Sequence, residues 1–378
     1  MANLQGLGEN AVRTMHALPP VSGGVDRAPS DFDPRAVLGQ VRSSLRRRVA
    51  GLGVLVVVLA VVAVLSVSIG ARDIAPDVVV RALVSASNGA ALTDYDSSVV
   101  LTERLPRTLV GLLVGAALGG SGVLMQALTR NPLVDGGILG VELGAACAVV
   151  AGIVFAGLVS ISATFWVALA GATLTAALVF SISRLTRSAS TAVSLVIAGA
   201  ATAAMLGAVI NLMIIRDESA FARYRFWSIG QISGRGETLP ELWPFALVGI
   251  VLALACGPTL NALALGESAA AGLGVRVRRA QLGVAFVAVL LCAVAVATAG
   301  PIGFIGLVGA HLARLIVGAD QRLLIPLGML CGAIVLLAAD VAGRLGPGNG
   351  EISVGIMTAV VGTPVFILLA RTRKLVEA

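Results

Sequence analysis

Residues 46–70 read RRRVAGLGVLVVVLAVVAVLSVSIG, which is three arginines followed by an uninterrupted apolar run. A membrane-spanning helix needs about 20 apolar residues, and this run has that length. A cleaved signal peptide has a shorter apolar core, of about 7–15 residues, close to the N-terminus. The run starts too late and is too long for a signal peptide. It therefore predicts an uncleaved first span with the N-terminus on the inside.

The rest of the chain has the same apolar character. Of its 378 residues, 57% are hydrophobic and 12% are charged, against about 25% charged residues in soluble domains. Such a chain cannot cover a soluble surface with polar groups, which excludes a cytosolic globular enzyme and a disordered chain. Hydropathy instead predicts an all-α, polytopic membrane protein with about ten transmembrane helices. The predicted spans are 49–70, 106–128, 138–157, 164–183, 192–215, 243–262, 280–299, 303–317, 324–342 and 352–370.

The chain divides into a membrane domain and two polar ends. Residues 1–48 are polar, with paired prolines and paired glycines, and predict a flexible cytoplasmic tail. Residues 49–371 form the ten-helix domain, and residues 372–378 form a short cytoplasmic C-terminal tail. With ten spans both termini lie on one side, and 18 of the 27 basic residues then fall in the inside segments. This excess predicts that both termini are cytoplasmic.

The residue counts exclude several kinds of chemistry. The single lysine, Lys374, follows an arginine, so the chain cannot form the phosphate-binding pattern G-x-x-x-x-G-K-[ST]. The four cysteines stand singly within apolar runs and the two histidines lie far apart, so we expect no metal site. The net charge of +7 comes mostly from arginines between apolar segments, which favours a lipid bilayer over a nucleic acid as the partner.

The segment 263–279, LALGESAAAGLGVRVRR, is the one predicted cytoplasmic loop long enough to fold into short helices. Its alanine-rich part, 267–271, can form a helical turn that Gly272 and Gly274 can end. The residues alone leave two interpretations open. The segment is either a short amphipathic helix that docks a cytoplasmic partner or a simple basic connector.

Charged residues at the edges of the spans form the second group of candidates. Arg104 and Arg107 stand three apart at the outer entry of the second span, where they either snorkel to the interface or dock an acidic partner. Asp340 and Arg344 stand four apart and can pair on one helix. Glu142, near the start of the third span, and Asp340 are the two acids that a proton relay could use.

With these segments in hand, the chain resembles the permease subunits of bacterial iron-siderophore, haem and vitamin B12 importers, which are type II ATP-binding-cassette (ABC) importers. The resemblance runs from about residue 100 to residue 371. It rests on RLPRT (104–108), GVLMQALTRNPL (122–133), ILGV (138–141), LGE (265–267), GLG (272–274), GPIGFIGL (300–307) and GTPV (362–365), with His311, Arg314, Asp340 and Arg344. The stretches YRFW (224–227) and LIVGAD (315–320) look closest to ferric-enterobactin permeases.

The resemblance implies the type II permease fold and a place in the bacterial cytoplasmic membrane. It implies import of a ferric siderophore, with ATP and Mg²⁺ held by a cytoplasmic ABC ATPase dimer, so that this chain binds no cofactor and is not itself an enzyme. A second permease chain, similar or identical, and an extracytoplasmic binding protein complete the importer. A heterodimer is favoured, and a short helix is expected in the outer loop 216–236.

The resemblance also assigns site residues. Acidic residues of the binding protein would pair with Arg104, Arg107 and Arg344. The ATPase would dock on the loop 263–279, where the matching residues are Leu265, Gly266, Glu267, Ala270, Leu273 and Gly274.

Three positions depart from the family pattern. Ala310 precedes His311 where many relatives have proline, Gly136 stands where relatives often have proline, and Glu142 stands where asparagine is common.

Two other interpretations of the function stay open. Haem or vitamin B12 could be the substrate of the same mechanism. A proton-coupled secondary transporter would need Glu142 or Asp340 to titrate in the pathway. The sequence contains no cluster of catalytic residues that would support an intramembrane enzyme.

Overall fold

The structure of the protein is a computed structural model, which describes residues 34–70, 74–87, 94–135, 137, 140–185, 191–215, 217–346 and 350–371. The chain separates into two compact units, Met1–Arg47 and Arg48–Ala378. Most of the predicted tail 1–48, and the predicted tail 372–378, lie outside the described residues. The described part of the first tail is helical, because α2 begins at Pro34 and not at residue 49. Proline suits the first position of a helix, and the alanine, leucine and arginine that follow favour helix.

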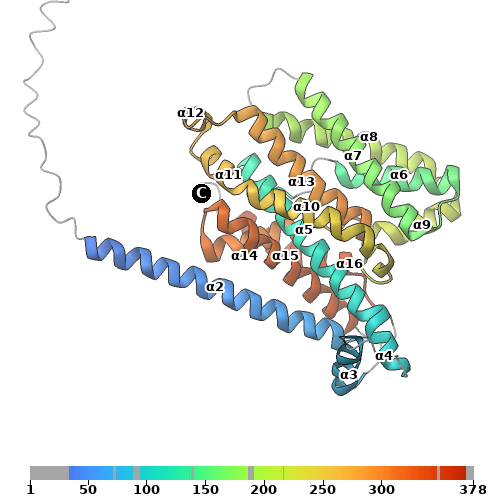
Figure 1. The fold of residues 1–378 in the computed structure, drawn as a ribbon. Helices are drawn as coiled ribbons and strands as arrows, with labels where there is room; N and C mark the ends of the chain where they lie inside the picture. Colours follow the sequence, from blue (N-terminus) through green and yellow to red (C-terminus); the bar gives the residue numbers. More distant parts are fainter. Residues whose placement is uncertain are drawn as a thin grey trace, which may run out of the picture. The chain divides into compact units, whose positions relative to one another are not determined.

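All the elements of the described residues are helices (Figure 1). They are α2 (Pro34–Ser68), α3 (Pro76–Ser87), α4 (Tyr95–Val99), the π-helix η1 (Val100–Arg104), α5 (Leu105–Thr129), α6 (Val141–Ala156), α7 (Ile161–Leu185), α8 (Thr191–Ile214), α9 (Glu218–Ser228), the 3₁₀ helix η3 (Gly236–Thr238), α10 (Leu239–Ala255), α11 (Gly257–Ala264), α12 (Glu267–Gly272), α13 (Val277–Ala299), α14 (Ile305–Val317), α15 (Gln321–Arg344) and α16 (Val354–Arg371).

Seven stretches of these helices are long and apolar enough to cross a membrane by length and composition. They are Ala50–Ser68, Tyr95–Thr129, Ile161–Ser183, Val193–Ile214, Gly236–Ala255, Val277–Ala299 and Gln321–Arg344. Three shorter apolar helices, α6, α14 and α16, lie at the predicted third, eighth and tenth spans. The all-α, polytopic fold is therefore confirmed, and every predicted span has an apolar helix at its position. The number of membrane crossings stays a prediction.

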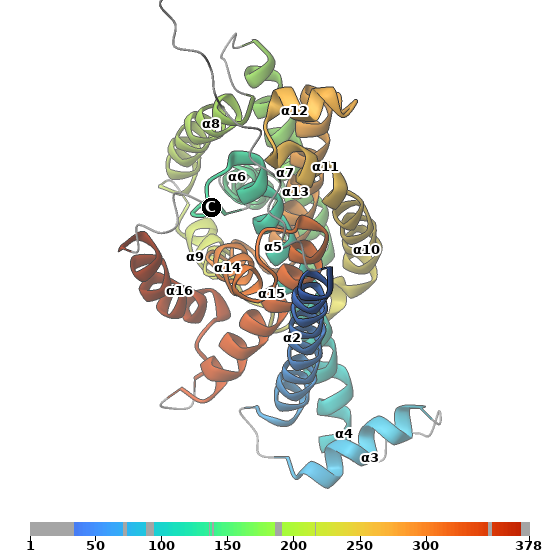
Figure 2. The same ribbon diagram turned by 90° about the vertical axis from the view of Figure 1, so that its left-hand side faces the viewer.

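Glycine permits the closest helix contacts in the core of the bundle. In both views α5 lies among α13, α14 and α15 (Figures 1 and 2). A Cβ atom on Gly119 of α5 would overlap the carbonyl oxygen of Gly328 of α15, and one on Gly122 would overlap the backbone of Gly306 in α14. Small residues let membrane helices pack at such short range. Gly207 in α8 differs, since no atom lies within 4 Å of its Cβ position.

Short helices occupy the two ends of this bundle. α12 lies at one end, while α3 and α4 lie at the other (Figures 1 and 2). The short helix expected in the outer loop 216–236 is α9, so that prediction is confirmed. Asp217 caps α9 and accepts a hydrogen bond from the amide of Ala220 at 3.0 Å. That bond holds the pKa of the Asp217 carboxyl below its usual value, because it favours the charged form.

Candidate functional site

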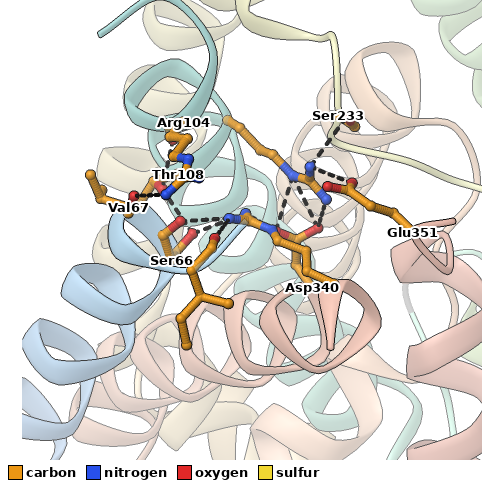
Figure 3. Close-up of polar contacts among 10 residues, drawn as sticks. Ser66, Val67, Arg104, Thr108, Ser233, Asp340 and Glu351 are labelled. Carbon is orange, nitrogen blue, oxygen red and sulfur yellow. Dashed lines mark hydrogen bonds and ion pairs between the residues drawn. The ribbon is translucent and has the colours of Figure 1, made fainter. Parts of the chain in front are cut away.

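Three arginines predicted as a docking site come together at one end of the bundle (Figure 3). Arg104 ends the π-helical turn η1, Arg107 lies in the first turn of α5, and Arg344 is the last residue of α15. We call these residues, with Ser66, Asp340 and Glu351, the arginine cluster. The cluster joins the end of α2, the start of α5 and the end of α15.

Asp340 is the central acid of the arginine cluster. Its side chain is 1% exposed, and an Oδ1 atom accepts from Nη2 of Arg107 at 2.7 Å. Its Oδ2 atom accepts from Nη2 of Arg344 four residues later, so the predicted helix pair is confirmed. Asp340 is therefore the buried counter-charge of two guanidinium groups.

Arg344 and Arg104 also donate hydrogen bonds to the C-terminal end of α2. Nη1 of Arg344 donates to the carbonyl oxygens of Ser66 at 2.6 Å and Ile69 at 2.7 Å. Arg104 is buried and donates to the carbonyl oxygen of Val67 at 3.2 Å. Guanidinium groups suit this task because each offers five donors in a fixed plane. These contacts satisfy carbonyl groups that the last turn of α2 leaves without helix partners.

Arg107 is the member of the cluster with a partner at the surface. Its Nη1 atom donates to Oε2 of Glu351 at 2.7 Å, and Glu351 is 30% exposed. Nη1 also donates to Oγ of Ser233 at 3.3 Å. A cavity of about 170 Å³ lies beside Arg107, Ser233, Asp340 and Glu351. The sequence predicted the arginines but missed Ser66 and Glu351. Ser66 lies 278 residues from its partner Arg344, and Glu351 lies 244 residues from its partner Arg107, so no local spacing marks either contact.

The loop 263–279 forms a compact projection at the other end of the bundle. α12 runs from Glu267 to Gly272, so the helical turn predicted there is confirmed. Gly266, at φ 106°, starts the helix, and Gly274, at φ 84°, follows its end. Both backbone conformations favour glycine.

The residues of this loop that are predicted to contact an ATPase divide into an exposed and a buried group. Leu265 is 67% exposed and Leu273 is 66% exposed, on either side of α12. Ala270 is fully buried, and its carbonyl oxygen accepts from the amide of Val275 at 3.0 Å. Nε2 of Gln281 donates to Oε1 of Glu267 at 3.0 Å, which ties α12 to α13. Two exposed leucines on a fixed turn form a surface suited to a protein partner.

α5 connects the two ends. Arg104 precedes it and Arg130 follows it. With 25 residues, α5 is about 37 Å long at about 1.5 Å per residue, which is enough to cross a bilayer. Nη2 of Arg130 donates to the carbonyl oxygen of Leu263, just before α12, at 2.9 Å. The arginine cluster and α12 therefore lie on opposite sides of any membrane that α5 spans.

The remaining candidates do not gather into a catalytic or metal centre within the part of the chain that the structure describes. There, no group of three or more His, Cys, Asp or Glu side chains could hold a metal ion. Glu142 lies in the first turn of α6 and Asp340 lies in the last turns of α15. Of the other departures from the family pattern, Ala310 is buried in α14, and Gly136 lies outside the described residues.

The long apolar helices, with the arginine cluster at one end of the bundle and α12 at the other, are those of a polytopic membrane protein. The family model described as the FecCD transport family matches residues 58–372, and the chain belongs to that family. The chain is 40% identical over 274 residues to the probable siderophore transport system permease protein of Bacillus subtilis (strain 168), covering 72% of this chain and 82% of that protein. It is 38% identical over 320 residues to the ferric enterobactin transport system permease protein of Escherichia coli (strain K12), covering 84% and 94%.

One solved structure and two further relatives extend this comparison. A solved metal-chelate type ABC transporter in an inward-facing conformation matches with a TM-score of 0.73 and 31% identity, over 84% of this chain and 98% of that chain. Relatives named as hemin and cobalamin permeases also match. The resemblance to type II ABC importer permeases is therefore confirmed. The chain is a polytopic permease of the cytoplasmic membrane, in a family whose members transport and do not catalyse.

Proposed function

We propose that this permease imports a ferric siderophore, with energy from a separate ABC ATPase dimer and with substrate delivered by an extracytoplasmic binding protein. Two of its relatives are named for siderophore transport. The chain also has a candidate docking surface at each end, with Arg107 and Glu351 at one and Leu265 and Leu273 at the other, as an importer with one soluble partner on each side requires. Haem and cobalamin are the alternative substrates, because relatives named for them match over similar shares of the chain.

The observation that carries the proposal is the exposure of Leu265 and Leu273 on either side of α12. Ala270 holds the turn from inside, and the contact between Gln281 and Glu267 holds it from α13. A rigid projection of this kind can transmit the movement of an ATPase subunit to α13 and to α5. The termini, on the same side as α12 in the predicted arrangement, are then cytoplasmic.

At the outer end, Arg107 is the arginine that a binding protein would reach. Its bond to Asp340 is buried, but its bond to Glu351 lies at the surface. An acidic side chain of the binding protein would replace Glu351 on Nη1 of Arg107. Arg104 and Arg344, which also belong to the predicted docking set, would act by holding α2 and α15 in place beneath that contact.

A proton-coupled secondary transporter is the alternative of a different class, and the geometry favours it less. Asp340 is occupied by two arginines, which leaves Glu142 as the remaining acid of the two candidates. A proton relay through a membrane domain needs several such groups in series.

The test of the ATPase contact is co-purification from the native membrane in a gentle detergent. Leu265→Asp and Leu273→Asp should each reduce the recovered P-loop ATPase by tenfold or more, because a charge enters the apolar contact. Leu345→Asp is the matched control. Leu345 is also 67% exposed, but it follows the last residue of α15 and lies beside the arginine cluster, at the end of the bundle opposite α12. Equal recovery with all three variants would contradict the proposal, as would wild-type protein recovered with no ATPase.

The substrate is tested by uptake into cells that lack the gene. Cells with the wild-type gene restored should accumulate iron from a radiolabelled ferric catecholate or hydroxamate siderophore, and should do so even when an uncoupler is present and ATP is maintained. Uptake of haem or cobalamin in place of the siderophores would assign the alternative substrate. Uptake abolished by the uncoupler at constant ATP would favour the secondary transporter.

A further inference from the structure

A cavity of about 310 Å³ lies at the end of the bundle that carries the arginine cluster. It is bordered by the C-terminal part of α6, the start of α7, the helix α9 and the loop 229–235. Ser233 of the same loop accepts a hydrogen bond from Arg107, which fixes the level of the cavity in the bundle. None of the functional residues discussed so far lines it.

Two residues that line this cavity each have a buried donor atom without an acceptor. Arg235 is 8% exposed and Trp227 is 4% exposed, and neither Nε of Arg235 nor Nε1 of Trp227 has a hydrogen-bond partner. Leaving a buried donor unpaired is costly, and each such group in a native structure calls for an explanation. The missing partner must be an acceptor, since both groups only donate.

The charge of the lining narrows the class of ligand. Arg235 and Arg223 both line the cavity, and its described lining residues include no carboxylate. Burial lowers the pKa of Arg235, because loss of water disfavours its charged form. Two guanidinium groups and an indole N–H suit an oxyanion, which guanidinium binds through short, charge-assisted hydrogen bonds.

The apolar part of the lining indicates that this oxyanion is attached to an apolar chain. Val159 and Phe226 line the cavity and are exposed large apolar side chains. Phe155, at the end of α6 and four residues before Val159, is also exposed. The site stands where α6 ends and α7 begins. In the predicted arrangement, in which both apolar helices cross the bilayer, this is the level of the lipid head groups. The volume is at the lower limit for ligand pockets, so a head group fits better than a whole metal chelate.

We propose that this cavity binds the phosphate group of an anionic phospholipid, through Arg235 and Trp227, with Arg223 at its entrance. The acyl chains then lie over Phe226 and Val159. Arg223 of α9 donates a hydrogen bond to the carbonyl oxygen of Leu158, in the loop between α6 and α7, at 3.5 Å. A lipid held there adds a further link between α9 and these two helices. The proposal does not depend on which substrate the permease carries.

Trp227 provides the signal for the test. The chain has three tryptophans, and Trp166→Phe with Trp243→Phe leaves Trp227 as the single fluorophore. The purified protein is reconstituted in zwitterionic vesicles that contain either brominated phosphatidylglycerol or brominated phosphatidylcholine at equal mole fraction, because bromine quenches nearby indole. Phosphatidylglycerol should quench Trp227 at a mole fraction at least tenfold lower than phosphatidylcholine does. Arg235→Gln should abolish that difference.

Controls separate the site from general lipid contact. Arg225→Gln removes a charge from the same helix, where Arg225 stacks on Phe226 with 5.5 Å between the guanidinium carbon and the ring centroid, but Arg225 does not line the cavity. This variant should keep the tenfold preference. If Arg235→Gln does not fold, Arg223→Gln is used, and native mass spectrometry counts retained phosphatidylglycerol.

Three results would overturn the proposal. The first is equal quenching by the two lipids. The second is a preference for phosphatidylglycerol that survives Arg235→Gln, or that survives Arg223→Gln with the same number of retained lipids. The third is loss of the preference on addition of millimolar inorganic phosphate, which would assign the cavity to a free oxyanion instead of a lipid.

Discussion

Asp340 is the residue on which the buried part of the arginine cluster depends. Its carboxylate compensates Arg107 and Arg344, both largely removed from water. Asp340→Asn would leave two guanidinium groups with no buried counter-charge, and we expect it to reduce the free energy of unfolding by about 3–5 kcal/mol. Glu351→Gln removes an acid that is 30% exposed and should cost no more than about 1 kcal/mol. Thermal unfolding of both variants in the same detergent measures the difference.

The same two variants separate stability from docking. Because Glu351 occupies Nη1 of Arg107, Glu351→Gln should increase binding of the substrate-loaded binding protein, whereas Arg107→Glu should weaken it. Both effects should shrink as salt is raised, since they act through partly exposed charges. Binding that is indifferent to Glu351→Gln and to salt would show that the partner does not use Arg107. Equal melting temperatures for Asp340→Asn and Glu351→Gln would contradict the central role of Asp340.

At the scale of the elements, the contact between α5 and α15 depends on glycine. Gly119→Ala places a methyl group against the carbonyl oxygen of Gly328, so the two helices must separate. We expect a loss of several degrees in the unfolding temperature, or failure to accumulate in the membrane. Gly207→Ala in α8 is the control, because its Cβ position has no atom within 4 Å and alanine favours helix. A similar unfolding temperature for both variants would show that the helices can adjust without cost.

The sequence predicts elements better than it predicts their partners. Hydropathy places every apolar helix, and the glycines around residues 267–272 place α12, because both signals are local. α2 begins at Pro34, 15 residues before the predicted start of the first span. Hydropathy misses this part because a polar helix next to a span has no apolar signal. The acceptors of Arg344 lie at Ser66 and Ile69, more than 270 residues away. Contacts between residues so far apart depend on how the helices pack, and no local spacing in the sequence predicts that packing.

At the scale of the whole molecule, the arrangement predicts that the arginine cluster and α12 face opposite sides of the membrane. Ser233, beside Arg107, and Ser268, in α12, are both exposed and lie near opposite ends of α5. The native cysteines give a low background, because Cys292 and Cys331 are buried and Cys147 and Cys256 are partly buried. Ser233→Cys and Ser268→Cys are therefore a matched pair of conservative probes for a membrane-impermeant maleimide.

The predicted orientation fixes the pattern of labelling. Ser268→Cys should react in inside-out vesicles and stay unlabelled in right-side-out vesicles, and Ser233→Cys should do the reverse. Labelling of both from the same side would contradict the transmembrane path of α5, on which the separation of the two docking surfaces rests. The mirror-image pattern would keep that path but invert the protein. α12 would then face the outside, where no ATP-driven partner could reach it.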